Sequence, residues 1–348
     1  MTRVQTVLGP IPTAELGITL SHEHVFIDLV DVAYSPPVHR SATNGDDRVS
    51  IENLWWIRHD WTSSRDNLRL DETETALFEL RRFRQAGGGS VVDATPRGLG
   101  GDPSRLAMVS QETGVHIIRG TGFYVGKAHP RRFTNADGAE VCDSILQDLL
   151  EGEGGVRSGV IGEIGCSWPL DPSEKVVLQA AARAQHTTAA PMILHPGRHP
   201  SAPVSLAEII IDSGGDPTRT VIAHMDRTDV SDRDLTRLIS LGFFVAYDLF
   251  GLETSFYPPH PSTAMPNDAA RIQTILRLAG LGLLDHIVVS HDVCMKHRLA
   301  SFGGHGYDHI LTNVRPQMEL LGASAKQIRE LIEENPLRWL SGSSAAPA

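Results

Sequence analysis

The stretch Gly159 to Gly165 (GVIGEIG), together with the segment 173–187 that follows it, contains the pattern that decides the fold. The first part is a short apolar run bounded by glycine, which is typical of a buried β-strand. The second follows Asp171-Pro172-Ser173-Glu174, a favourable helix start, and spaces its apolar residues three and four apart, as one helix face requires. The pattern therefore predicts one strand followed by one helix.

The same alternation recurs along the chain. Short apolar runs predict eight strands, at residues 17–22, 90–95, 115–124, 159–165, 192–195, 220–224, 243–249 and 286–292. Helical spacing between them is clearest at 73–86, 173–187, 232–241 and 269–281. Because the strands are continuously apolar, we expect parallel strands that are buried on both faces.

Eight such units predict an α/β fold of the TIM (β/α)₈ barrel type. An open, doubly wound sheet is the alternative, but no Gly-x-Gly-x-x-Gly follows the first strand. We expect a short N-terminal β-hairpin at 4–15 and a long insertion after the first strand, at 30–70, that forms a lid or a packed loop. Residues 1–340 are predicted to form a single hydrolase domain, and the Ser/Ala-rich tail 341–348 to be disordered.

Composition excludes several classes of protein. The chain has 348 residues, 41% of them hydrophobic, and carries a net charge of −11, which disfavours nucleic acid as a partner. No apolar run is long enough to cross a membrane, and the N-terminus lacks the pattern of a signal peptide. Three cysteines without close spacing argue against a disulfide framework. A cytoplasmic location is the simplest prediction.

Residues that can bind metal ions stand at or near the ends of five predicted strands. They are His22, His24, Glu163, His195, His224 and Asp292. Enzymes on this barrel place their chemistry at the C-terminal ends of the strands, so we expect these side chains to meet. Imidazole nitrogens and carboxylate oxygens are ligands that Zn²⁺ and similar ions prefer. Each residue alone could be a hydrogen-bonded structural histidine or a helix-capping carboxylate, but burying all six without a cation would be costly.

Two details refine this set. In Leu20-Ser21-His22-Glu23-His24 the two imidazoles are one residue apart and should point to the same side of an extended strand. Neighbouring strand residues point oppositely, so only one of His291 and Asp292 can face the barrel axis, and we expect Asp292 to do so.

The chain resembles the phosphotriesterase-like branch of the amidohydrolase superfamily from Val4 to about Leu340. The resemblance is to the phosphotriesterase-related subgroup. Its motifs here are residues 5–9 (QTVLG), 19–24 (TLSHEH), 159–170 (GVIGEIGCSWPL), 195–198 (HPGR), 224–228 (HMDRT) and 303–307 (GGHGY). The run from Glu163 to Leu170 is long and the most specific of them.

The resemblance implies two divalent ions, with zinc expected and manganese or cobalt as alternatives. His22, His24 and Asp292 would hold the more buried ion, His195 and His224 the more exposed one, and Glu163 would bridge them. Phosphotriesterases proper use a carboxylated lysine as the bridge, so assembly of this site should not depend on bicarbonate. The expected reaction is attack by a metal-bound hydroxide, with Asp292 as the catalytic residue that moves its proton.

The subgroup resemblance implies an amidase for N-acyl taurine compounds, with N-acetyltaurine as the best single substrate. Candidate substrate-binding residues are Tyr124, Arg198, Arg227, Lys296, His305 and Tyr307. A guanidinium can bind sulfonate oxygens through parallel hydrogen bonds, although each basic residue could equally be an exposed loop residue. Arg298 is a further candidate.

Two other readings stay open: a lactonase or phosphotriesterase with the same metals, and a non-catalytic binding protein. Asp226-Arg227 and Asp248-Leu249 stand where phosphotriesterases proper have a proton relay, so organophosphates are not the expected main substrates. The expected partner is a small anionic molecule, and the resemblance implies a homodimer.

Overall fold

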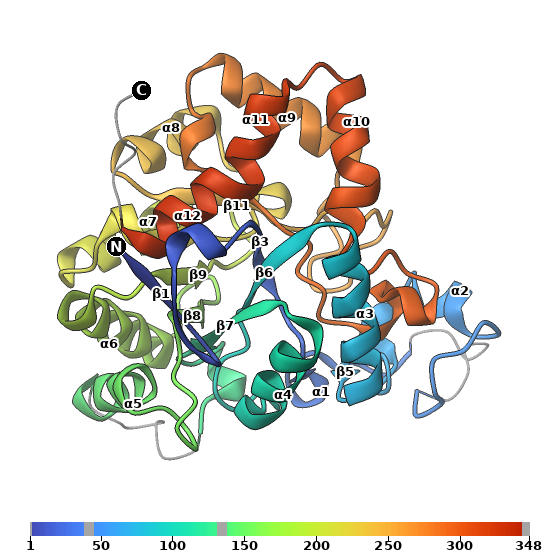
Figure 1. The fold of residues 1–348 in the computed structure, drawn as a ribbon, viewed down its shortest axis with the longest axis horizontal. Coiled ribbons are helices and arrows are strands. Elements are labelled where there is room, and N and C mark those ends of the chain that lie inside the picture. Colours follow the sequence, from blue (N-terminus) through green and yellow to red (C-terminus); the bar gives the residue numbers. More distant parts are fainter. Residues whose placement is uncertain (1, 38–44, 131–137, 343–348) are drawn as a thin grey trace.

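A nearly closed ring of parallel strands forms the centre of the molecule, as the sequence predicts (Figure 1). The computed structural model describes residues 2–37, 45–130 and 138–342. Within these ranges the eight strands of the ring follow chain order, and each pairs in parallel with the next. They are β3 (Ile18–Glu23), β6 (Gly88–Asp93), β7 (His116–Thr121), β8 (Val160–Gly165), β9 (Met192–His195), β10 (Thr220–Ile222), β11 (Phe244–Tyr247) and β12 (Ile287–Val289).

Helices follow the strands and cover the outside of the ring. The longer helices between the ring strands are α3 (Thr73–Gln85), α4 (Pro103–Thr113), α5 (Gly138–Leu150), α6 (Pro172–Thr188), α7 (Ala202–Asp212), α8 (Asp232–Ser240) and α9 (Asp268–Gly280). After β12 come α10 (Arg315–Leu320), α11 (Ala325–Arg329) and α12 (Asn335–Ser341). The four helices and eight strands predicted from sequence are therefore all present, although most of the predicted strands are one to several residues too long.

The seam between β3 and β12 is closed mainly by polar contacts. Ser21 Oγ donates to the Val289 carbonyl (3.1 Å), and the amide of His22 donates to Ser290 Oγ (3.0 Å). Further along, the amide of Asp292 donates to the carbonyl of His22 (3.1 Å). The first and last strands of the barrel are thus joined beside the predicted metal ligands.

Two apolar clusters confirm that the strands are buried on both faces. Alternate strand residues such as Val92, Ile118 and Val288 meet inside the ring, in one cluster with Trp339. Their neighbours, such as Val91 and Ile117, belong to a second cluster that includes residues of the surrounding helices. This arrangement explains the continuously apolar strand sequences.

The N-terminal hairpin is also present. β1 (Arg3–Thr6) pairs with β2 (Gly9–Pro12) in antiparallel register, and Val4 packs in the inner cluster beside Trp339. α12 lies against β1 (Figure 1), so both chain ends close the barrel at the face opposite the strand C-termini. Ser341, the first residue of the predicted tail 341–348, is the last residue of α12, and residues 343–348 lie outside the described residues.

The insertion after β3 contains β4 (Ile27–Asp28), α1 (Val30–Ala33), α2 (Leu54–Ile57) and β5 (Arg69–Leu70). β4 and β5 pair in antiparallel register and hold its two ends together. α2 lies at the edge of the molecule, on the side away from α6 (Figure 1). Within the described residues no helix is both long and apolar enough to cross a bilayer.

Candidate metal centre

The six predicted ligands lie together at the C-terminal ends of the ring strands. His22 and Glu163 are within β3 and β8, and His195 is the last residue of β9. His24, His224 and Asp292 follow β3, β10 and β12 by one to three residues. His224 and Asp292 both have positive φ values, 62° and 52°, which are uncommon outside glycine and turn these side chains after their strands have ended.

Irregular pairing in β3 and β8 re-aims the ligands there. The register shifts between Leu20 and Glu23 on β3, and between Ile161 and Ile164 on β8. Leu20 therefore packs in the outer cluster, whereas His22, two residues later, faces the other ligands. Such bulges are frequent next to active sites, where they redirect a side chain.

One group of ligand atoms comes from the two ends of the chain. His22, His24 and Asp292 each offer one ligand atom, and these atoms all lie within 4.8 Å of one another. His24 Nε2 lies 3.1 Å from Asp292 Oδ1, and His22 Nε2 lies 3.9 Å from the same oxygen. Three donors at these separations can converge on a single ion.

A second group is formed by Glu163, His195 and His224, again within 4.8 Å. His195 Nδ1 lies 2.7 Å from Glu163 Oε2 and 3.0 Å from His224 Nε2. Glu163 also faces the first group: its Oε2 is 3.6 Å from His22 Nε2, and its Oε1 is 3.6 Å from His24 Nε2. One carboxylate therefore lies between the two groups, where a bridging ligand would have to be.

Asp248, just after β11, was not among the predicted site residues. Its two carboxylate oxygens accept hydrogen bonds from Nδ1 of His22 and Nδ1 of His224, both at 2.8 Å. Each ring then presents its Nε2 to the centre of the site. A carboxylate behind a histidine is the usual way in which proteins orient a metal-binding imidazole.

The electrostatics follow from packing carboxylates and imidazoles together in a buried place. Burial lowers the pKa of His22, but the hydrogen bond to Asp248 and the charge of Glu163 outweigh it and raise this pKa to about 10. Burial raises the pKa of Glu163, yet its contact with His195, its hydrogen bond with His224 and the charge of His22 hold it well below its usual range. Burial lowers the pKa of His195 to about 3. Glu163 is therefore ionised and His195 is neutral, the states in which they can bind a metal ion, whereas His22 would release a proton on binding one.

A further observation supports the fit of these residues to a divalent ion. His22 Nε2 is buried and has no hydrogen-bond partner, although it points at the other ligand atoms. Buried polar atoms are rarely left without a partner. A cation among these nitrogen and oxygen donors would satisfy His22 and offset the negative charge of the carboxylates.

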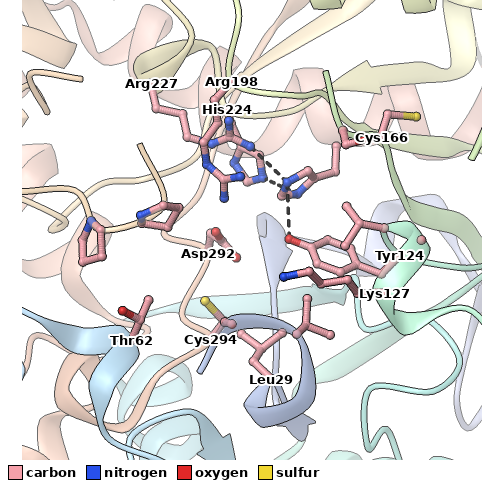
Figure 2. Close-up of a pocket in the computed structure, with 18 of the residues that line it drawn as sticks. Leu29, Thr62, Tyr124, Lys127, Cys166, Arg198, His224, Arg227, Asp292 and Cys294 are labelled. Carbon is pink, nitrogen blue, oxygen red and sulfur yellow. Dashed lines mark hydrogen bonds between the residues drawn. The ribbon is translucent and has the colours of Figure 1, made fainter. Parts of the chain in front are cut away.

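A cavity of about 970 Å³ opens over this cluster. His195, His224 and Asp292 line it, and so do three of the predicted substrate-binding residues, Tyr124, Arg198 and Arg227. Figure 2 shows Arg198 and Arg227 on one side of Asp292, with Leu29 and Thr62 on the other.

Three other predicted substrate-binding residues do not line this cavity, which corrects that part of the prediction. Lys296 Nζ is buried against Asp66 Oδ1 (2.8 Å) and Glu72 Oε1 (3.2 Å) of the insertion and its junction with α3. The Tyr307 hydroxyl donates to the carbonyl of His24 (2.6 Å), so it supports a ligand from behind. His305 lies beside a neighbouring cavity, where its Nε2 accepts from Arg298 (3.3 Å).

His291 and Asp292 follow β12 rather than belong to it, and they point to different places. Asp292 joins the ligand group. His291 instead places its Nδ1 2.7 Å from Glu23 Oε1, away from the cavity. Glu23, the residue between the two N-terminal ligands, thereby ties the end of β3 to the chain after β12.

Comparisons with known proteins agree with this geometry. A sequence model of the Phosphotriesterase family matches residues 2–340. The N-acetyltaurine hydrolases of Rattus norvegicus and Homo sapiens are each 41% identical to this chain over 342 residues, covering 97% of this chain and 98% of theirs.

Two solved structures are similar. A resiniferatoxin-binding protein from Rhodobacter sphaeroides has a TM-score of 0.93 and 33% identity, over 98% of this chain and 95% of the other. A phosphotriesterase homology protein from Escherichia coli, solved with phosphate in its active site, has a TM-score of 0.78 and 25% identity, over 94% and 99%.

Proposed function

Because the chain belongs to the phosphotriesterase family, we propose that it is a metal-dependent amidase that hydrolyses N-acyl taurines, with N-acetyltaurine as the reference substrate. Two relatives that cover nearly the whole chain carry that name. We also propose that the chain is a member of the amidohydrolase superfamily. The homodimer and the cytoplasmic location stay predictions.

The six ligands would hold two divalent ions, zinc first, with manganese or cobalt as alternatives. His22, His24 and Asp292 would bind one, His195 and His224 the other, and Glu163 both. Bound there, the ions would act as Lewis acids on the scissile carbonyl and make water nucleophilic at neutral pH.

The residues of the chain supply the proton transfers and the positioning. Asp292 reaches both the ligand cluster and the cavity, so its carboxylate can take a proton from the attacking water and return it to the leaving amine. The Tyr124 hydroxyl lies 3.3 Å from His195 Nε2 at the cavity wall, where it can orient the substrate carbonyl.

Two arginines without carboxylate partners support the choice of an anionic substrate. Among the described residues, neither Arg198 nor Arg227 forms an ion pair with Asp or Glu. Arg227 is 4% exposed, its Nη2 contacts His195 Nε2 and the Pro196 carbonyl, and its Nη1 has no partner. Buried guanidinium groups normally have an anion beside them. Here a sulfonate in the cavity would provide it.

The test is to assay zinc-loaded and manganese-loaded protein on N-acetyltaurine, a homoserine lactone and paraoxon. We expect the highest kcat/KM on N-acetyltaurine. Preference for the lactone or for paraoxon would replace the amidase with the corresponding alternative, and no turnover on any of them would favour a binding protein.

Arg227→Met tests the role of the arginine. We expect kcat/KM for N-acetyltaurine to fall by roughly 10- to 100-fold, chiefly through KM, because a charge-assisted contact is lost. Arg233→Met, at an exposed position on α8, is the matched control and should have no effect. An unchanged KM in Arg227→Met would remove this residue from substrate binding.

A further inference from the structure

The cavity is much larger than the reference substrate requires. N-acetyltaurine has only about ten non-hydrogen atoms, whereas pockets of roughly 300–1,000 Å³ enclose most of a drug-sized ligand. At about 970 Å³, this cavity is at the upper end of that range. An acetyl group would leave most of it filled with water.

Part of the side of the cavity away from the arginines is apolar, next to Lys127. Two segments form this apolar wall, residues 29–35 around α1 and residues 61–62. A third, residues 257–259 after β11, joins the wall to Arg198, whose Nε donates to the Tyr257 hydroxyl (3.1 Å). Leu29, Val32, Ala33 and Trp61 contribute hydrocarbon or aromatic surface, and the described residues of these segments that line the cavity include no charged side chain. Leu29 and Thr62 lie across Asp292 from Arg198 and Arg227 (Figure 2).

This apolar wall is held in place by its own contacts. The Ser35 amide donates to the Thr62 carbonyl (3.1 Å), which joins the first two segments. The rings of Trp61 and Tyr257 lie with their centroids 6.2 Å apart, which joins the second and third. The wall is therefore formed before a ligand arrives, so binding an apolar group against it requires little reordering.

We propose that the preferred substrates are N-acyl taurines whose acyl group is considerably longer than acetyl. The inference rests on the proposed function and names the substrate class within it. The sulfonate binds on the side of Arg198 and Arg227, the amide lies over Asp292, and the acyl chain extends along Leu29, Val32, Ala33 and Trp61. Hydrolysis releases the fatty acid and taurine.

The test is kcat/KM of the metal-loaded full chain on N-acetyl-, N-butanoyl-, N-octanoyl- and N-dodecanoyltaurine. Burying one methylene group multiplies affinity by up to about fourfold, so the octanoyl compound should exceed the acetyl compound by at least about tenfold. If N-acetyltaurine is hydrolysed and kcat/KM falls steadily as the chain lengthens, this inference is wrong and the proposed function stands. If no N-acyl taurine is hydrolysed, the proposed function itself is wrong.

Two variants test where the chain lies. Ala33→Phe and Val32→Phe fill the apolar wall, and each should lower the octanoyl-to-acetyl ratio of kcat/KM at least about fivefold. Ala325→Phe, an exposed position on α11, is the control and should leave the ratio unchanged. Melting temperatures establish that the variants are folded. An unchanged ratio in both wall variants would place the acyl group elsewhere and overturn the assignment.

Discussion

Asp248 shows how one side chain can organise a site without touching its contents. It is fully buried and accepts a hydrogen bond from Nδ1 of each of two histidines, His22 in β3 and His224 just after β10, which are far apart in the chain. Burial raises its pKa, but His224 and His22 outweigh this and lower it, so Asp248 is an anion at all ordinary pH values. Both imidazoles therefore keep a proton on Nδ1 for Asp248 and turn Nε2 toward the other ligand atoms.

Asp248→Asn should disturb both histidines. The amide nitrogen of asparagine cannot accept a hydrogen bond, so one ring loses its partner and can place its proton on Nε2 instead. We expect metal affinity, measured by competition with a chelator, to fall roughly 10- to 100-fold, with activity falling in parallel. Asp212→Asn, exposed at the end of α7, is the control. Unchanged affinity would mean that the ligands orient themselves without Asp248.

Asp292→Asn separates metal binding from turnover. The other five ligands remain and asparagine keeps one oxygen, so we expect most of the metal to be retained in elemental analysis. The amide cannot accept the proton of the attacking water, so kcat should fall roughly 10²- to 10⁴-fold. A variant with nearly full activity would contradict the proposed role of Asp292 in proton transfer.

At the scale of single residues, the sequence indicated which residue types could form the site but not which way their side chains point. All six residues of the cluster could be predicted because each is a histidine or carboxylate at or near a strand end. Lys296, His305 and Tyr307 do not line the cavity, because a place in the chain after β12 does not determine which way a loop turns its side chains. Asp248 also follows a strand, β11. The resemblance to phosphotriesterases indicated only that a relay histidine is absent there, and not that Asp248 orients two imidazoles.

At the scale of elements, Lys296 fixes the insertion to the barrel. Its ammonium group is almost completely buried among Asp66, Asp71 and Glu72. The amide of Lys296 also donates to the carbonyl of Asn67 (2.9 Å). The loop after β12, which carries Asp292, is thereby tied to the segment that closes the insertion.

Lys296→Met should destabilise this junction by about 1–3 kcal/mol at pH 7, because the carboxylates lose their cation. Partial burial raises the pKa of Glu72, but the charge of Lys296 outweighs it and lowers this pKa in the folded state. That contribution is present above the unfolded pKa of about 4.3 and is lost as the pH falls through the folded value. The stability gap, that is, the difference in free energy of unfolding between wild type and variant, should therefore become smaller below about pH 4.

Urea unfolding at pH 7 and pH 3 measures that gap. Lys326→Met, at an exposed position on α11, is the control for loss of a positive charge. A gap that stays constant or widens on acidification would show that the ion pairs with Lys296 do not stabilise the junction.

Element type and order could be read from the apolar runs, but the register shifts could not. On β8, strict alternation would have turned Glu163 outward with Ile161, and only the shift before Ile164 turns it inward. The period of two thus predicts which segments are strands, while the exact facing of a ligand depends on pairing with the neighbouring strands.

For the whole molecule, removal of the metal should affect stability as well as activity. A ligand at about 100 times its Kd stabilises the folded state by about 2.7 kcal/mol, so exhaustive chelation should lower Tm by roughly 5 °C. Turnover should disappear with it, and added zinc or manganese should restore both. A verified metal-free protein with unchanged Tm and activity would contradict the proposed centre.

The barrel as a whole was predictable because eight strand and helix pairs leave few alternatives. The cavity was not, because its far wall is built by α1 and Trp61 of the insertion and by the loop at 257–259. These segments meet through a few long-range contacts, such as the Trp61–Tyr257 ring pair, that no local pattern encodes.

The seam between β3 and β12 has a consequence for how the protein is made. His24 and Asp292, which lie 3.1 Å apart in the finished site, are separated by 268 positions in the chain. During synthesis the first histidines leave the ribosome long before their partner is translated, and the emerging polypeptide meanwhile exposes an unclosed sheet edge. Assembly of the whole cluster is thus tied to translation of Asp292, and fragments that stop short of it should be unable to complete the centre.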